Sequence, residues 1–260
     1  MTPDQHHAWL QGVLATLSAR RDVVGVVGMG STADSSRVDE WSDHDIAIIA
    51  KPEATAVFRD GLVWLPYPED LVLRTVEHHG GGKAVYGNGH LVEWGVATLE
   101  SLRTWVADDY RVLLDRGGVA ETMAEIASRR FAANEADAER DIAVFLFELL
   151  HGVGRWRRGE RVSGGNVIRN EAVGALLRAV RATLPSHEAG ALDRLDGFRR
   201  VEQAYPKLAA QIAEAVAQSP ETAARRLLDI ATEHLEVGPT GLPPAAVQAV
   251  TRRLGWPSPA

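Results

Sequence analysis

Apolar residues form both strand and helix patterns in the first half of the chain and helix patterns alone in the second half. Over residues 6–20 they fall on one face of a helix, at Leu10, Val13, Leu14 and Leu17. Apolar runs bounded by glycine and proline then predict strands at 23–27, 43–49, 62–65, 91–96 and 110–114. Short helices are expected after residue 31 and at 69–77.

Past residue 118 no further strand is predicted. Helical apolar spacing covers 138–157, 167–183, 192–205, 207–218 and 222–236, with glycine or proline at the breaks. This change predicts an α+β protein with two domains. A mixed β-sheet flanked by helices is expected at 1–118 and an all-α helical bundle at 119–237. A linker and a short terminal helix are expected at 238–260.

Glycine is concentrated between the predicted strands at 62–65 and 91–96. The segment His78-His79-Gly80-Gly81-Gly82-Lys83 is followed closely by Tyr86-Gly87-Asn88-Gly89. So many glycines disfavour regular structure, which predicts either a mobile lid over a site or a plain loop. The two histidines lack a third ligand at a spacing suited to zinc.

Composition narrows the class of protein. The 260 residues are 45% hydrophobic, enough for a proper core, and include no cysteine, which excludes disulfides and thiolate metal sites. A net charge of −7 argues against a large nucleic-acid surface. No signal-peptide pattern is visible, and no apolar run approaches the roughly 18 residues of a membrane span. We therefore expect a cytoplasmic protein without membrane contact.

The stretch 23–50 carries the candidate chemistry. A strand leads into the turn Gly28-Met29-Gly30-Ser31, and the chain returns as Asp43-His44-Asp45 before a second apolar strand. Side chains alternate along a strand, so the two carboxylates share a face, whereas His44 points away and is structural. A turn able to cradle phosphate beside paired carboxylates able to hold Mg²⁺ outlines a nucleotide site.

These motifs resemble the nucleotidyltransferase superfamily of polymerase-β-like enzymes. Its signature is a Gly-Ser turn after a strand, here Gly30-Ser31, then Asp-x-Asp opening a second strand, here Asp43 and Asp45. A third carboxylate lies on a later strand, and Glu93 stands where it would. The segment 105–115 and the helical second half are most similar to the aminoglycoside and lincosamide nucleotidyltransferases.

The resemblance implies an enzyme that moves AMP, or another NMP, from ATP or another NTP to a hydroxyl of a small molecule. Asp43, Asp45 and Glu93 would hold Mg²⁺, which clamps the attacking and leaving oxygens. Gly30 would let the backbone approach the triphosphate, and Ser31 would donate a hydrogen bond to it. Antibiotic acceptors, and a homodimer of the kind related enzymes form, are further implications.

One departure from the family pattern concerns the phosphates. Where a basic residue often follows the Gly-Ser turn, this chain has the acidic Asp34. Arg37 is a candidate substitute, or else a solvated arginine. Lys83, or an arginine of the basic run 155–161, is a second candidate for the β- and γ-phosphates. The alternative for that run is a favourable interaction with a helix C-terminus.

Glu148 is the only charge in the apolar segment 142–150, which predicts a buried carboxylate. Burial raises the pKa of a carboxyl, and a raised pKa suits a general base acting on an acceptor hydroxyl. In the aminoglycoside branch a carboxylate of the helical domain can serve this role. The alternative is a structural ion pair with an arginine such as Arg155.

Two other functions remain open from the sequence. The enzyme could modify a protein or a tRNA end, as nucleotidyltransferase toxins do, although the acidic net charge counts against tRNA. A nucleotide-binding regulatory protein without turnover is the alternative outside enzymes. Such a protein would have no physical need for three converging carboxylates.

Overall fold

A computed structural model describes residues 1–77, 80–129, 137–236, 238 and 241–257. The chain divides into two compact units, Met1–Arg130 and Phe131–Ala260. The first is built around a mixed sheet and the second from helices, so the predicted α+β class is confirmed. Helix α4 (Val119–Ser128), which follows the predicted boundary at 118, belongs to the first unit.

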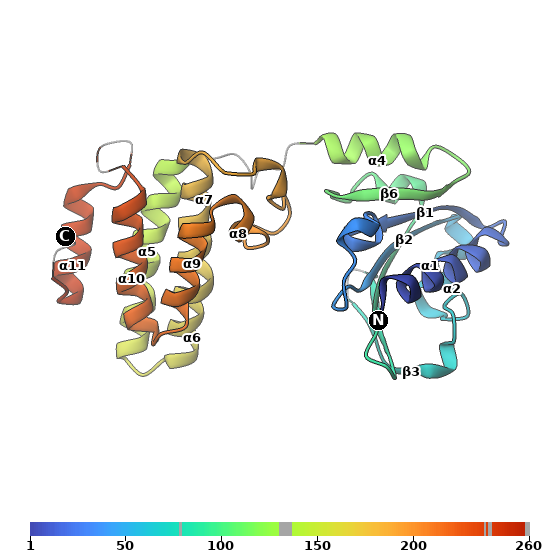
Figure 1. The fold of residues 1–260 in the computed structure, drawn as a ribbon, viewed down its shortest axis with the longest axis horizontal. Coiled ribbons are helices and arrows are strands. Elements are labelled where there is room, and N and C mark those ends of the chain that lie inside the picture. Colours follow the sequence, from blue (N-terminus) through green and yellow to red (C-terminus); the bar gives the residue numbers. More distant parts are fainter. Residues whose placement is uncertain (78–79, 130–136, 237, 239–240, 258–260) are drawn as a thin grey trace. The chain divides into compact units, whose positions relative to one another are not determined.

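The first unit contains a six-stranded sheet in the order β3-β4-β5-β2-β1-β6 (Figure 1). The strands are β1 (Val23–Met29), β2 (His44–Ala50), β3 (Leu71–Val76), β4 (Gly82–Tyr86), β5 (Leu91–Ala97) and β6 (Tyr110–Asp115). The central strands β2 and β5 are parallel, and every other neighbouring pair is antiparallel. The remaining helices of this unit are α1 (Pro3–Ser18), α2 (Thr55–Asp60) and α3 (Leu99–Leu102).

Helices cover both faces of the sheet, because side chains alternate along its central strands. In β2, Ile46 and Ile48 pack with α1 and α2, whereas Ala47 and Ile49 pack with α3 and α4. We call these the α1 face and the α4 face. All four side chains are buried, with at most 1% of their surface exposed. The start of β2, where Asp45 lies, is therefore held by packing on both sides.

Two predicted elements before the glycine-rich segment are wrong. Residues 62–65 form a turn rather than a strand, anchored by the buried Trp64 ring, whose indole nitrogen donates to the carbonyls of Phe58 and Gly61. Residues 71–76 form the edge strand β3 rather than a helix. Pairing with β4 decides the conformation of this segment, since strand preference depends on context.

The glycine-rich segment is largely a β-hairpin rather than an irregular lid. The first residue of β4, Gly82, has no room for a side chain, because a Cβ there would lie only 2.2 Å from the Trp94 ring. Lys83 consequently lies on a strand. His78 and His79 lie outside the described residues.

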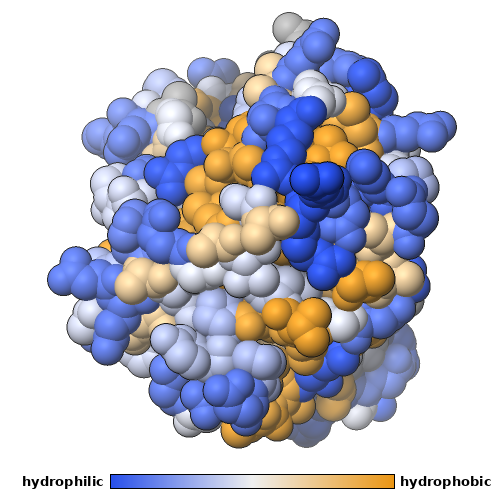
Figure 2. Space-filling view, turned by 90° about the vertical axis from the view of Figure 1, so that its right-hand side faces the viewer, coloured by the Kyte–Doolittle hydropathy of each residue, from blue (hydrophilic) through white to orange (hydrophobic). Residues whose placement is uncertain are grey.

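Exposed apolar side chains in this unit gather along one part of the sequence. They include Val63, Val72 and Leu73, each with more than 60% of its surface exposed. On the face shown in Figure 2, orange apolar patches alternate with blue hydrophilic side chains. Within the described residues, no helix combines the length and apolar character needed to cross a bilayer.

The second unit packs its helices around one apolar core. They are α5 (Ala138–Arg157), α6 (Arg161–Asn166), α7 (Val173–Thr183), α8 (Val201–Ala204), α9 (Pro206–Val216), α10 (Pro220–His234) and α11 (Pro244–Leu254). A π-helical segment, Val167–Ala172, joins α6 to α7. The terminal helix α11 contributes Val247, Val250 and Leu254 to this core.

The predicted helix at 192–205 forms only at its end, as α8. The buried Asp193 side chain accepts hydrogen bonds from the backbone nitrogens of Leu195 and Asp196, and it pairs with Arg200 at 3.1 Å. Such local side-chain bonds to the backbone compete with helix formation.

The buried carboxylate of α5 is Asp141 rather than Glu148, so the burial expected of Glu148 is wrong. The Asp141 side chain is 2% exposed and lies 2.9 Å from Nε of Arg178. Glu148 is 24% exposed and lies 3.5 Å from Nδ1 of His151, while Arg155 donates to the Ser163 hydroxyl. The large apolar side chain that α5 exposes is Phe147.

This difference predicts unequal effects for two matched substitutions. We expect Asp141→Ala to lower the free energy of unfolding by about 2 kcal/mol, because it removes a buried carboxylate together with its charged hydrogen bond from Arg178. Glu148→Ala, on the same helix, should cost less than about 0.5 kcal/mol, as is usual for partly exposed pairs. Chemical denaturation measures both, and equal losses would contradict the assignment.

Candidate active site

The Gly30-Ser31 turn is tied directly to the Asp-x-Asp segment. Gly30 has a φ of 54°, which favours glycine, and a short 3-10 turn follows it. The Ser31 hydroxyl donates to the carbonyl of Asp43 at 3.2 Å, and the Thr32 hydroxyl accepts from the backbone nitrogen of Asp45 at 2.9 Å. The turn therefore positions both aspartates, and the Ser31 hydroxyl is engaged with backbone.

Parallel pairing of β2 and β5 places two carboxylates side by side. Asp45 and Glu93 are register partners, so their side chains leave neighbouring strands on the same face. Lys83 is the register partner of Glu93 on β4, and its Nζ lies 3.2 Å from Glu93 and 3.4 Å from Glu77. One row across the sheet thus carries two acids and one base.

Asp45 experiences an excess of negative charge. Burial, followed by the charges of Glu93 and Asp43, raises the pKa of Asp45 to about 7, although Lys83 opposes the shift. Hydrogen bonding to Glu93 raises the pKa of Lys83 in turn. Carboxylates that lack enough counter-charge are the donor set that Mg²⁺ prefers, so the residues present fit this metal.

Asp43 precedes β2, and its role as a metal ligand stays a prediction. Its charge reaches Asp45, while its carbonyl is held by Ser31 and by His6. In the part of the chain that the structure describes, no three His, Asp or Glu side chains lie close enough together to form a metal site as they stand. Asp45 and Glu93 are the two that the strands bring together.

A pocket of about 410 Å³ lies beside these carboxylates. Its lining includes Asp45, Glu93, the glycines of the β3–β4 hairpin and Trp105. The Trp105 ring packs on Gly95, where a Cβ would lie 2.3 Å from it. Sequence reasoning missed Trp105 as a site residue, although a glycine inside a strand, such as Gly95, often marks a close approach.

The candidate phosphate-binding residues around the turn already have partners. Arg37 forms an ion pair with Asp109. The Asp34 side chain accepts from the backbone nitrogen and the hydroxyl of Ser36, at 2.9 and 2.7 Å. The acidic residue at position 34 therefore caps a local turn, which explains the departure from the family pattern in structural terms.

Behind the carboxylates, three histidines form a buried cluster on the α1 face. His44 points away from Asp45 as predicted; it stacks on His6 with ring centroids 3.5 Å apart, and its Nδ1 lies 2.7 Å from Nε2 of His90. Burial lowers the pKa of His44 to about 2, so the ring is neutral. His6 Nε2 lies 3.0 Å from the Asp43 carbonyl, which supports the Asp-x-Asp segment from behind. Sequence reasoning missed His6 and His90.

Comparison with known proteins finds structural neighbours only. No protein-family model and no curated protein matches the chain. A nucleotidyltransferase-like protein from Exiguobacterium sibiricum matches with 14% identity and a TM-score of 0.36, over 95% of this chain and 77% of that one. An aminoglycoside 6-adenyltransferase from Bacillus subtilis matches with 11% identity and a TM-score of 0.30, over 96% and 91%.

Both solved structures carry names from the superfamily that the motifs resemble. At these identities and TM-scores the matches carry no conclusion about the activity of this chain. We therefore base function on the geometry of the site.

The raised pKa of Asp45 predicts that replacing this carboxylate stabilises the protein, by an amount that depends on pH. The carboxyl has a pKa near 7 when folded and about 3.9 when unfolded, so its contribution favours folding at low pH and is lost as pH rises through 7. We expect Asp45→Asn to raise the melting temperature of the metal-free protein by about 3 °C or more at pH 8, and hardly at pH 4.

Asp22 is the matched control, because its hydrogen bond with Arg20 lowers its pKa. Its contribution is present at neutral pH and is lost on acidification, so Asp22→Asn should lower the melting temperature at pH 8. Thermal unfolding in EDTA from pH 4 to 8 measures both. A pH-independent effect of Asp45→Asn would contradict the charge assignment.

Lys83 offers a second prediction. As the cation beside Glu93 it competes with a metal, so Lys83→Gln should tighten Mn²⁺ binding by roughly three-fold or more, measured by electron paramagnetic resonance. If Lys83 also contacts the triphosphate, the same variant should weaken NTP binding. Lys51→Gln changes a lysine that follows the other end of β2 from Asp45; it is the control and should change neither.

Proposed function

We propose that this chain is a Mg²⁺-dependent nucleotidyltransferase that moves AMP, or another NMP, from an NTP to a hydroxyl of a small molecule. One observation carries the proposal. Asp45 and Glu93 lie side by side on neighbouring parallel strands at a pocket of about 410 Å³, and the Gly30-Ser31 turn ends the adjoining strand β1.

Asp45 and Glu93, with Asp43, would hold the metal. When bound, Mg²⁺ supplies positive charge to the attacking and leaving oxygens of an in-line transfer. Burial and the neighbouring charges of Glu93 and Asp43 raise the pKa of Asp45, which supports this assignment because a divalent cation would favour the charged carboxylate.

Other residues would bind and orient the nucleotide. The Trp105 ring lines the pocket and offers a flat surface for a base, and the hairpin glycines let a ligand approach the backbone. Lys83 is 38% exposed and its Nζ lies 3.2 Å from Glu93, which lines the pocket, so it is a candidate for contact with the β- and γ-phosphates. Gly30, Ser31 and Arg37 remain candidates for triphosphate contacts around the turn.

The proton of the acceptor hydroxyl needs a base, and two carboxylates are candidates. Glu93 lies in the pocket itself. Glu148, in the helical unit, is partly exposed and lies beside His151. Both roles remain part of the proposal, and substitution separates them.

The acceptor class rests on the resemblance of the motifs. An aminoglycoside or lincosamide is the first candidate, and the net charge of −7 suits a cationic acceptor. That activity would confer antibiotic resistance in a cytoplasmic setting, and a homodimer is part of the same expectation. A protein or tRNA end as acceptor is the second candidate, and a regulatory nucleotide-binding protein without turnover is the third.

The test is pyrophosphate release with Mg²⁺, each NTP, and a panel of hydroxylated antibiotics, a tRNA and a protein acceptor. We expect turnover with a small acceptor, reduced about 1,000-fold or more in both Asp45→Asn and Glu93→Gln. Wild-type turnover in Asp45→Asn would remove the metal assignment. Tight Mg-NTP binding without turnover on any acceptor would favour the regulatory alternative.

The general base is identified by the pH profile of kcat at saturating Mg-NTP. If Glu148 is the base, Glu148→Gln should remove the acidic limb of the profile while NTP binding and Mn²⁺ binding stay as in the wild type. If Glu93 is the base as well as a ligand, Glu148→Gln should leave the profile unchanged.

A further inference from the structure

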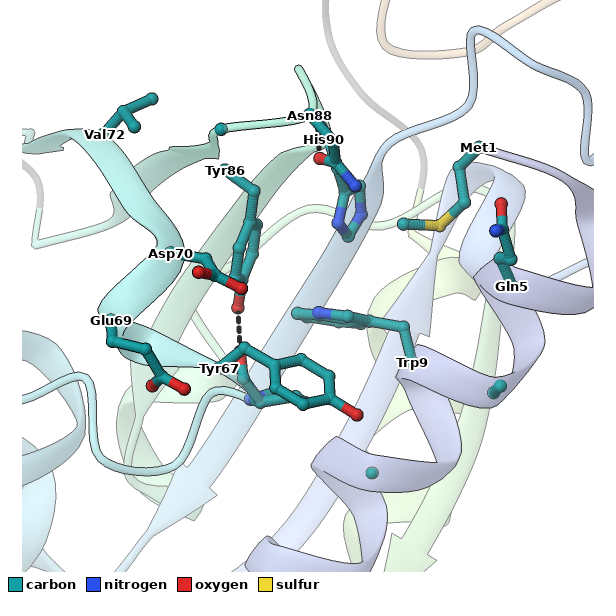
Figure 3. Close-up of a pocket in the computed structure, with 14 residues that line it drawn as sticks. Met1, Gln5, Trp9, Tyr67, Glu69, Asp70, Val72, Tyr86, Asn88 and His90 are labelled. Atoms are coloured by element: carbon teal, nitrogen blue, oxygen red, sulfur yellow. Dashed lines mark hydrogen bonds between the residues drawn. The ribbon is translucent and has the colours of Figure 1, made fainter.

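A second pocket, of about 790 Å³, lies on the α1 face of the sheet. It is formed by helix α1, the turn 66–70 and the β4–β5 turn (Figure 3). Trp9 and Tyr86, which line it, pack in the core of the α1 face together with Ile46 of β2. Asp45 is the neighbour of Ile46 on this strand, so its side chain points to the opposite face of the sheet. This pocket is thus distinct from the proposed nucleotide site.

Aromatic rings form the walls of this pocket. Trp9 and Tyr86 are 8% and 5% exposed, with ring centroids 6.2 Å apart and nearly perpendicular planes. The Tyr86 hydroxyl donates to the Pro66 carbonyl at 2.5 Å, which fixes the ring. Figure 3 shows the rings of Trp9, Tyr67 and Tyr86 around one space.

Tyr67 supplies the outer wall from a strained backbone position. Its φ is 52°, one of two positive values at non-glycine residues among those described, and 66% of its surface is exposed. This conformation is unfavourable for a side chain with a Cβ. The exposed ring gains little from the core, so neither packing nor backbone preference accounts for a tyrosine here.

The buried tryptophan also carries an unused donor. The Trp9 indole nitrogen has no partner of hydrogen-bonding geometry in the described part of the chain, although it lies close enough to affect the pKa of Tyr86. Burying an unpaired donor costs free energy that an apolar side chain would avoid. What Trp9 supplies and an aliphatic residue could not is the face of an aromatic ring.

The exposed charged side chains at the rim of the pocket are acidic, and the N-terminal ammonium of Met1, another lining residue, acts on His90 in the wall. Glu69 and Asp70 lie at its rim, exposed, and neither forms an ion pair with a described basic side chain. The lining side chains include no Lys or Arg. Burial, with lesser effects of His6 and the N-terminal ammonium, lowers the pKa of His90 to about 4, so the histidine in the wall is neutral at pH 7.

We propose that this pocket binds the alkylammonium group of a small organic cation, held between the rings of Trp9, Tyr67 and Tyr86 and attracted by Glu69 and Asp70. The negative faces of aromatic rings attract a cation, and desolvated aromatic sites recognise ammonium groups in this way. Unpaired carboxylates at the rim add a long-range attraction that salt screens. This binding is independent of nucleotidyl transfer.

Choline is the probe, with its uncharged carbon isostere dimethylbutanol as the matched control ligand. Isothermal titration calorimetry should show saturable binding of choline that weakens with added NaCl, and much weaker binding of the isostere. Tyr67→Gly, which suits the positive φ, should weaken choline binding roughly five-fold or more, whereas Tyr67→Phe keeps the ring and the affinity. Glu69→Gln with Asp70→Asn should weaken binding and reduce its salt dependence.

Two variants outside the pocket complete the test. Trp41→Ala removes a ring that is 86% exposed elsewhere in the unit and should leave choline binding unchanged. Asp45→Asn should also bind choline normally, which separates this site from the proposed nucleotide site. Equal affinity for choline and dimethylbutanol, unchanged affinity in Tyr67→Gly, or no saturable binding of choline would each overturn the proposal.

Discussion

The pairing of β2 with β5 is the contact on which the candidate active site depends. These are the only parallel neighbours in the described sheet, and their register sets Asp45 against Glu93. Packing on both faces of β2 fixes this register, because a slip by one residue would exchange the side chains of the α1 and α4 faces. Two like charges can remain adjacent because the rest of the strand determines where they lie.

The same alternation gives the two sides of β2 different electrostatic character. On one side Asp45 gathers negative charge with a single lysine nearby. On the other, His44 is buried among His6, His90 and Trp9, and the pKa values of His44 and His90 fall well below neutrality. His44 and His90 therefore add no positive charge behind the carboxylates, while the His6 ring supports the backbone of Asp43.

Much of this site could be predicted from local sequence, because its main features depend on residues that are close together in the chain. The alternation of Asp43, His44 and Asp45 needs only the strand to be recognised, and the turn at Gly30 is marked by its glycine. The pairing of Glu93 with Asp45 joins residues far apart in the chain, so local patterns did not predict it. Glu93 was identified only through the resemblance to the nucleotidyltransferase superfamily. The partner of Lys83 was also missed, because the glycine-rich segment was assigned to a loop and a strand was not considered.

The errors share a physical cause, which is that apolar composition does not reveal which side of an element is covered. Glu148 was expected inside because its neighbours are apolar, yet α5 exposes Phe147 and buries Asp141 against Arg178. A helix was expected at 69–77, yet residues 71–76 form the edge strand β3, which leaves Val72 and Leu73 exposed. Burial of a charge is settled by the partner that reaches it, and Arg178 lies far along the chain from Asp141. A carboxylate in an apolar stretch is therefore a stronger indication of a base when a cavity or a second charge is found beside it, as at Glu93.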